Sequence, residues 1–495
     1  MTGRSHGAAQ AAIQMTIAAH PAPYSTDSSR TSRVIAIVGG GFSGVSVAIH
    51  LLRQPTSTPL RIVIYEPRHE LGAGVAYATR DYPYPLNVAA GQMSLDAANP
   101  SDFLDFARSQ GVAAAPGDYL PRQLYGEYLR ARFEKACAAT PAHLRAVHYR
   151  ARALQLRRSA DERWELWLDD GSAQRADEIV LALGNPPPAS LPQLNPIASS
   201  AFCVDDPWSL GSCAHENIAS VLLVGSGLTM IDAALRLAAI RPRVRHIHVL
   251  SRHGLLPQQQ ATEPLPALEP ALDELLVPGR SARQLSQGVR RVAQLIQDAH
   301  GDWRELFALL RPRIPALWQQ LAEAERARFL RHLRAYWDVN RHRVPAGPLA
   351  AVRALERLGA LQVHAGRLES LRPLDDAVEV QWRPRGAARA RAWLVDRVVN
   401  CTGPDSQVTR NPDPLVQASL AAGWLRPDAL GLGIDTDPDG RVISRDGVPV
   451  DSLYYIGPWL RARDWEATAV PELRVHAARL AARLADRTSN RAATG

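Results

Sequence analysis

The sequence is poor in lysine, cysteine and long apolar runs, and each shortage excludes a class of chemistry. Among 495 residues, Lys135 is the only lysine, which excludes a Schiff base elsewhere and the phosphate-binding lysine of a P-loop. The cysteines lack the C-x-x-C spacing of redox pairs and zinc sites and stand at Cys137, Cys203, Cys213 and Cys401. We therefore expect reduced thiols of a cytoplasmic protein, no metal centre and no flavin disulfide reductase.

Membrane and nucleic-acid partners are not expected either. Every apolar run is broken by glycine or charge well before the roughly 20 residues of a transmembrane helix. The formal net charge is +8, but the basic residues are scattered and not interleaved with aromatics, which favours small anionic ligands over nucleic acid. Residues 1–30 lack the continuous apolar segment of a secretory signal and predict a disordered extension.

What the sequence does contain is a dinucleotide-binding fingerprint near its start. An apolar run over residues 34–38 predicts a buried strand, and glycines follow at G-x-G-x-x-G spacing before a predicted helix. The first glycine allows a tight turn, the second lets the backbone approach a pyrophosphate, and the third allows close helix packing. A second predicted strand ends in a carboxylate able to accept hydrogen bonds from a ribose. The expected cofactor contacts are Gly39, Gly41, Phe42, Ser43, Gly44 and Glu66.

A second, weaker copy of the fingerprint follows a predicted strand over residues 220–224. Met230 replaces its third glycine, and the next strand ends in a hydroxyl and a guanidinium instead of an acid. That pair suits a ribose 2′-phosphate and favours NADPH over NADH, whereas the alternative is a solvated basic turn. The expected contacts are Gly225, Gly227, Thr229, Ser251 and Arg252. Two nucleotide sites imply electron transfer from a nicotinamide to a flavin.

The order of predicted strands and helices indicates an α/β fold with two Rossmann-like domains, a discontinuous FAD domain and an inserted NAD(P) domain that carries a helical insertion. Strand ends at Gly184 and Gly403 are the expected crossovers between the domains, and both glycines are expected near the cofactors. The predicted boundaries are 1–30 for the extension, 31–200 and 358–495 for the FAD domain, 201–264 for the NAD(P) domain and 265–357 for the helical insertion.

Motifs along nearly the whole chain from residue 33 carry a family resemblance. They are Gly72–Tyr77, Leu86–Asn87, Gln92–Ser94, Pro121–Gly126, Gly225–Asp232, Trp337–Arg343 and Trp465–Arg474. The chain resembles the two-dinucleotide-binding flavoprotein superfamily that includes class B flavin monooxygenases. Within it, the chain looks similar to a branch that contains a bacterial FAD-dependent urate hydroxylase, with amine N-hydroxylases as more distant relatives.

Two departures from that superfamily's pattern limit what is carried over. The histidine of the Baeyer–Villiger fingerprint is missing before the second glycine motif, which argues against ketone oxygenation. Gly457-Pro458 stands where many such flavoproteins have Gly-Asp, so backbone amides or other side chains must hold the FAD there.

The resemblance implies reduction of FAD by NAD(P)H, formation of a flavin hydroperoxide from dioxygen, and oxygen transfer to a small molecule. Thr468 is expected to open a helix beside the flavin, and Asn87 to place its amide near the flavin edge, with a turn-forming asparagine as the alternative. An anionic substrate needs cationic donors, for which Arg341 and His342, with Arg343, form the densest cluster. Alternatives are a basic helix end without catalytic role, or a site at Arg122 and Tyr125.

The leading hypothesis is a urate hydroxylase that forms 5-hydroxyisourate in purine catabolism. The alternatives are an N-hydroxylating amine monooxygenase, for which a carboxylate-lined pocket is expected, and a flavin redox protein that does not oxygenate. Oligomeric state is left open.

Overall fold

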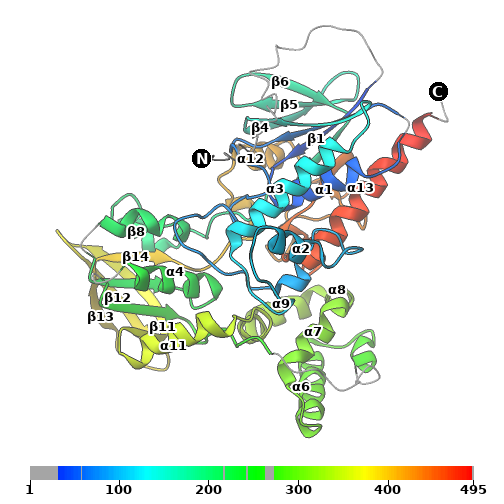
Figure 1. Cartoon of the computed structure of the whole chain (residues 1–495). Coiled ribbons are helices and arrows are strands. Elements are labelled where there is room, and N and C mark those ends of the chain that lie inside the picture. The colour runs from blue at the N-terminus through cyan, green and yellow to red at the C-terminus, as the bar shows by residue number, and fades with distance from the viewer. Residues whose placement is uncertain (1–31, 57, 216–217, 241–243, 262–271, 493–495) are drawn as a thin grey trace, which may run out of the picture.

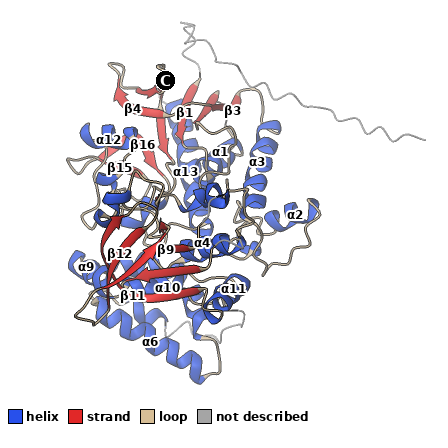
Figure 2. Cartoon of the chain, turned by 90° about the vertical axis from the view of Figure 1, so that its left-hand side faces the viewer, coloured by secondary structure: helices blue, strands red, loops and turns tan. Residues whose placement is uncertain are grey.

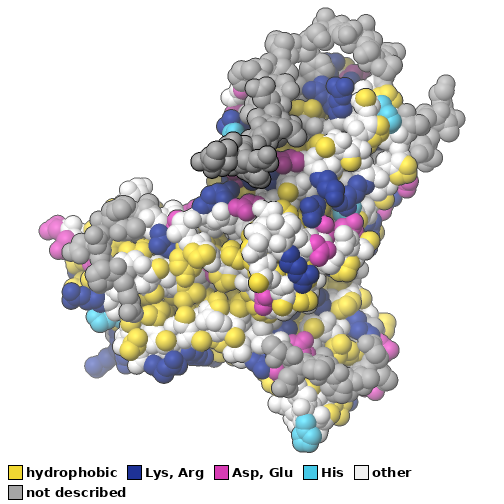
Figure 3. Space-filling view, viewed as in Figure 1, with side chains coloured by type: hydrophobic (Ala, Val, Ile, Leu, Met, Phe, Trp, Pro, Cys, Tyr) yellow, Lys and Arg dark blue, Asp and Glu magenta, His cyan; other side chains and the backbone are white. Residues whose placement is uncertain are grey.

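The computed structural model describes residues 32–492 apart from residues 57, 216–217, 241–243 and 262–271, so the predicted extension over 1–30 lies outside the described residues. The chain folds into an upper domain that holds both termini of the described chain, a second domain beside it and a helical lobe below (Figure 1). The space-filling view shows the same three parts, with apolar side chains gathered around the second domain's helices on this face (Figure 3).

The first domain is built on a six-stranded sheet in the order β15-β16-β7-β1-β2-β3. Strands β1, β2, β3, β7 and β16 run parallel, and the apolar run predicted at residues 34–38 is the buried part of β1, paired with β2 and β7. The strands are β1 (Arg33–Val38), β2 (Leu60–Tyr65), β3 (Leu144–Tyr149), β7 (Glu178–Leu181), β15 (Arg441–Ile443) and β16 (Pro449–Tyr455).

Helices pack against one face of this sheet, and a smaller sheet lies toward the other. Every residue of α1 is buried, between the sheet and the long helices α3 and α13. The helices are α1 (Phe42–Leu52), α2 (Asp102–Ser109), α3 (Arg122–Ala138), α12 (Pro414–Ala421) and α13 (Val470–Ala492). The antiparallel sheet consists of β4 (Ala153–Arg158), β5 (Trp164–Leu168) and β6 (Ala173–Ala176), with α12 against β4.

The second domain contains a seven-stranded sheet in the order β13-β12-β11-β10-β9-β14-β8. Its parallel part is covered by α4 (Leu228–Ala239) and α11 (Ala346–Arg357), which contact each other, and Figure 2 shows this sheet below the first one. The strands are β8 (Cys203–Val204), β9 (Ser220–Val224), β10 (His246–Ser251), β11 (Leu361–Pro373), β12 (Val378–Pro384), β13 (Arg391–Val395) and β14 (Arg397–Asn400).

The helical lobe is inserted between β10 and α11. It contains α6 (Ala282–Asp298), α7 (Leu306–Leu310), α8 (Ile314–Gln320), α9 (Glu323–His332) and α10 (Arg334–Arg341). A Ser281–Gln284 capping box starts α6, which satisfies backbone N–H groups at the first turn. Among the described residues no helix is long and apolar enough to cross a membrane.

The predicted domain boundaries need a correction. Residues 361–400, assigned by sequence to the FAD domain, form β11 to β14 of the second sheet, and Leu194 and Ile197 already lie in that domain's core. Strand β10 pairs in parallel with β9 on one side and with β11 on the other, and the chain reaches β11 only after the helical lobe. Apolar periodicity identifies a strand but not the sheet that it joins. Because a long insertion lies between β10 and β11, the sequence alone did not indicate that these two strands pair.

Candidate functional site

The first glycine loop forms a cradle in which side chains have no room. Gly39 has a φ of +105°, and a Cβ atom there would lie 2.2 Å from the carbonyl oxygen of Ala182, the residue after β7. At Gly44 a Cβ atom would lie 2.0 Å from the Gly39 carbonyl oxygen, so α1 approaches the loop as closely as its backbone allows. The N-terminus of α1, with Gly41 as its N-cap, can therefore face a pyrophosphate.

Glu66 lies where the sequence places the ribose acceptor. It is buried after the end of β2, and its carboxylate accepts hydrogen bonds from the backbone N–H groups of Gly40 (2.9 Å) and Arg68 (3.0 Å). Each carboxylate oxygen keeps a lone pair beyond these bonds. The residue thus fixes the glycine loop and retains acceptor capacity for a ribose.

A second pair of glycines completes this cradle, and sequence reasoning did not assign them to the site. Gly72 donates from its backbone N–H to the Gly40 carbonyl (2.7 Å), and Gly74 lies against Gly41, with a Cβ position 3.2 Å from the Gly41 Cα atom. Both have positive φ values. The available signal was the Gly-x-Gly spacing at 72–74, directly after the second strand.

The side chains of Phe42 and Ser43 are turned into the protein. Both are buried, and the Phe42 ring lies 6.3 Å from that of Tyr125. Only their backbone N–H groups are left for a phosphate. Tyr125 itself is fully buried among aromatic rings, which removes it as a substrate contact.

The loop over residues 87–96 is held between the first domain and the second. Arg474 of α13 donates to the Ser94 carbonyl (3.0 Å), and Gln260 of the second domain donates to the Asn87 carbonyl (3.0 Å). The Asn87 side chain is exposed. Its role at the flavin edge stays a prediction.

The C-terminal part of the FAD cradle combines a strained glycine with the start of α13. Gly457, buried after β16, has a φ of +148° and a Cβ position 2.8 Å from the Tyr455 hydroxyl oxygen. Thr468 is half-buried two residues before α13 begins at Val470. The helix start thus lies two residues later than predicted, and Thr468 stays a predicted flavin contact.

The second glycine loop repeats the first in the other sheet. Gly225 has a φ of +112° and a Cβ position 2.5 Å from the Cys401 carbonyl oxygen, whereas Gly227, the N-cap of α4, faces open space. Thr229 lies half-buried in the first turn of α4, and Met230 fills the third glycine's place inside the core.

The end of β10 carries the guanidinium of Arg252 beside this loop, without an ion pair among the described residues. Ser251 accepts hydrogen bonds from the Gly254 N–H (3.0 Å) and the Ser226 hydroxyl (2.9 Å). Arg252 is exposed and has no ion pair with a described carboxylate. Arg385 donates to His253 (3.2 Å), and burial with the two neighbouring arginines lowers the pKa of His253.

The connections between the domains run side by side. Pro188 and Pro404 form an antiparallel bridge, and Gly184 and Gly403 lie in the segments β7–β8 and β14–β15 in which the chain passes from one sheet to the other. Both glycines have positive φ values and open space around them.

An ion pair joins the two domains beside these connections. Arg122 of α3 donates to Asp232 of α4 at 2.7 Å, with both side chains largely buried. Burial raises the pKa of Asp232, and Arg122 opposes that shift. Arg122 is therefore a structural tie between domains, not a free substrate contact.

Carboxylates occupy the predicted catalytic cluster at the end of α10. Arg341 lies 3.4 Å from Glu466, His342 lies 3.8 Å from Asp338, and Arg343 lies 3.2 Å from Glu305. Burial lowers the pKa of Arg341 and of His342. Each of the three thus has a described carboxylate within 4 Å, so the cluster does not present the free cationic donors that an anionic substrate needs.

Comparison with known proteins agrees with the two cradles. Residues 36–186 match a family of FAD-NAD(P)-binding domains. An uncharacterized protein of Mycobacterium tuberculosis is 25% identical, over 91% of this chain and 95% of the relative. These findings support an α/β fold with two dinucleotide-binding domains, with FAD and NAD(P)H as the cofactors.

Solved structures show which proteins share that fold. L-lysine 6-monooxygenase of Pseudomonas syringae superposes with a TM-score of 0.63 at 15% identity, and ornithine N-hydroxylase of Kutzneria sp. 744 with 0.62 at 14%. In each case 92% of this chain and 99% of the other are covered. Bacillithiol disulfide reductase of Bacillus cereus reaches 0.51 at 14% identity, covering 92% of this chain and 99% of the reductase, so the fold alone does not decide the reaction.

Proposed function

We propose that the protein is a FAD-dependent, NAD(P)H-driven monooxygenase that hydroxylates the nitrogen of a small amine in the cytoplasm. The reaction consumes substrate, dioxygen, NAD(P)H and a proton, and yields hydroxylated substrate, water and NAD(P)⁺. FAD, when bound, supplies hydride acceptance and oxygen activation. The observation that carries the proposal is the pair of glycine cradles in a fold shared with lysine and ornithine N-hydroxylases.

The expectation of urate hydroxylation loses its support. Urate requires free cationic donors, but Arg341 and Arg343 are turned to the carboxylates of Glu466 and Glu305. The alternative interpretation of this cluster, a basic helix end satisfied by its own charges, accounts for those contacts better. A thioredoxin-type reductase is also disfavoured, because the sequence has no C-x-x-C pair.

The chain's own residues divide the work of holding the cofactors. The backbone of Gly41 and of the first turn of α1 faces the expected FAD pyrophosphate, and Glu66 offers a ribose acceptor. The backbone of Gly227 and of the first turn of α4 faces the expected pyrophosphate of the nicotinamide cofactor. Arg252, exposed and without an ion pair to a described carboxylate, supports NADPH as the preferred reductant.

The test is oxygen-coupled NAD(P)H oxidation by the purified protein. We expect a yellow protein in which an amine substrate increases NADPH oxidation and yields hydroxylamine product in proportion, with little hydrogen peroxide. Urate is the comparison substrate and should leave the rate unchanged. Equal rates with every compound and with none would show a flavin redox protein instead.

A further inference from the structure

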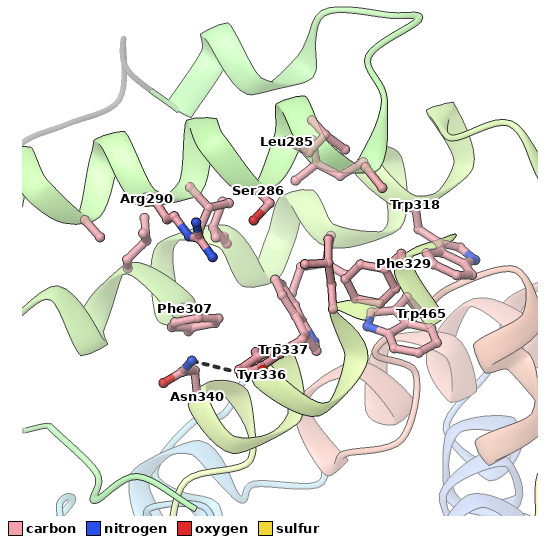
Figure 4. Close-up of a pocket in the computed structure, with 18 of the residues that line it drawn as sticks. Leu285, Ser286, Arg290, Phe307, Trp318, Phe329, Tyr336, Trp337, Asn340 and Trp465 are labelled. Carbon is pink, nitrogen blue, oxygen red and sulfur yellow. Dashed lines mark hydrogen bonds between the residues drawn. The ribbon is translucent and has the colours of Figure 1, made fainter. Parts of the chain in front are cut away.

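The helical lobe contains a half-open cavity that the glycine cradles do not explain. It has a volume of about 330 Å³, within the range of about 300–1,000 Å³ that is typical of small-molecule sites. Figure 4 shows its wall formed by α6 above and by α7 and α10 below. Aliphatic and aromatic side chains make up most of this wall, and its aromatic members are Trp303, Phe307, Trp318, Phe329, Tyr336, Trp337 and Trp465.

The aromatic wall is fixed by contacts among its own members. Trp318 stacks on Trp465 with ring centroids 4.6 Å apart, and Phe307 meets Trp337 edge-on at 5.4 Å. Protein interiors leave few voids larger than a water molecule. An apolar space of this size between braced rings is therefore suited to an apolar ligand.

One end of the cavity carries the guanidinium of Arg290, which has no ion pair among the described residues. Arg290 and Ser286 stand four residues apart on α6, and both side chains point into the cavity (Figure 4). Arg290 is exposed and has no ion pair with a described carboxylate, whereas the largely buried Arg311 and Arg341 pair with Glu472 and Glu466. Guanidinium groups bind carboxylates by two parallel hydrogen bonds.

The cavity also adjoins the FAD domain. Trp465, which belongs to its wall, precedes Thr468, the predicted flavin contact, by three residues. The Trp337 indole donates to Glu466 at 2.8 Å and so fixes the boundary between the two sites.

We propose that this cavity binds the substrate by an apolar body and a single carboxylate, with the carboxylate at Arg290. The identification as the substrate site rests on the proposed monooxygenase function, whereas the binding does not. Because unpaired polar groups lose free energy in an apolar cavity, short polar molecules such as ornithine or urate fit this wall poorly.

Binding is measured by calorimetry on the FAD-loaded protein, with decanoate as the alkyl probe and 4-phenylbutyrate as the aryl probe. At least one of these two carboxylates should bind about tenfold more tightly than decylamine, ornithine or urate. The reason is that the two probes combine an apolar body with a carboxylate, whereas the comparison compounds do not. The stronger of the two shows whether the cavity prefers a chain or a ring.

Two variants and a matched control locate the site. Arg290→Ala should weaken carboxylate binding about tenfold and leave 1-decanol binding unchanged, and Ala293→Trp should abolish both by filling the cavity. Arg291→Ala changes the neighbouring exposed arginine, which lies outside the cavity, and should have no effect. Equal effects of Arg290→Ala and Arg291→Ala, or no binding of either probe, would overturn the proposal.

A turnover measurement separates this inference from the proposed function. 10-Aminodecanoate combines the carboxylate and apolar body with an amine, and we expect it to stimulate NADPH oxidation. Binding without stimulation would leave the cavity assignment standing and refute the N-hydroxylase proposal for this site. If an amine stimulates NADPH oxidation and binds equally well to Ala293→Trp, the assignment of the cavity as the substrate site would be refuted. The proposed monooxygenase function would then still stand.

Discussion

Single residues decide whether the first cradle can exist, and Gly44 is the most exacting of them. Gly44→Ala places a Cβ atom 2.0 Å from the Gly39 carbonyl oxygen, so α1 must move away from the loop. We expect purification without FAD and loss of the absorbance near 450 nm. Gly347→Ala in α11, where a Cβ atom meets nothing within 4 Å, is the control and should retain the flavin.

Arg252 is expected to discriminate between the two nicotinamide cofactors. Because it offers an exposed guanidinium at the end of β10, Arg252→Ala should lower kcat/KM for NADPH by about tenfold or more and leave NADH unchanged. Arg357→Ala, at an exposed arginine ending α11, should change neither value. A parallel loss with both coenzymes would contradict recognition of the 2′-phosphate.

His248 should make stability depend on pH. Its ring stacks on Trp393 at 4.6 Å, and burial, with the nearby His364 and His246, lowers the pKa of His248 to about 4. Between pH 6.5 and 4 the unfolded chain therefore binds a proton at this position that the folded chain does not, and stability falls as the pH falls.

The measurement is the melting temperature of the protein and of His248→Phe between pH 7 and pH 5. The variant keeps the aromatic packing but has no proton to bind, so its melting temperature should fall less, by a few degrees in difference. Identical pH profiles would show that this histidine titrates normally.

At the scale of elements, the contact between the end of α10 and the segment before α13 depends on the buried carboxylate of Glu466. Burial alone would raise the pKa of Glu466, but Arg341, His342, the Trp337 indole and Arg461 outweigh it and the pKa is lowered. Two motifs far apart in the sequence, 337–343 and 465–474, meet at this charge.

Glu466→Gln should therefore leave the buried Arg341 with only the more distant carboxylate of Glu472, 3.9 Å away. Removing one partner of a buried pair costs about 3–5 kcal/mol, so the free energy of unfolding in urea should fall by an amount of this order. Glu356→Gln breaks the exposed pair with Arg353 at 2.7 Å and should cost under about 1 kcal/mol. Similar losses of unfolding free energy in both variants would show that the Glu466 carboxylate stabilises the fold no more than an exposed ion pair does.

At the scale of the whole molecule, the tie between Arg122 and Asp232 holds the two domains in register. A second ion pair, between Asp81 and Arg236 at 2.9 Å, spans the same interface. Nucleotides held by separate domains must face each other for hydride transfer, so this interface controls the approach of one cofactor to the other.

Asp232→Ala should slow flavin reduction by NADPH about tenfold in stopped-flow absorbance, while reduction by dithionite, which needs no second domain, stays unchanged. The double variant with Arg122→Ala should be no slower than the single one, because both remove the same pair. An unchanged rate in Asp232→Ala would exclude a positioning role for the tie.

The sequence by itself determined the two nucleotide cradles, the crossovers at Gly184 and Gly403 and the α/β class. These features are local, since apolar runs and glycine spacing within about 30 residues specify each strand, turn and helix start. It could not determine which sheet receives β11 to β14, because strand pairing across a long insertion is settled by packing alone.

Only the tertiary structure decided what the charged clusters do. In the sequence, Arg341 and His342 resemble a ligand site, but folding brings Glu466 and Asp338 against them from distant or neighbouring turns. The aromatic cavity likewise has no local signature, because its wall combines residues of α6 to α10 with Trp465. Charge neutralisation and cavity shape depend on side chains that meet in space, and linear spacing does not encode that meeting.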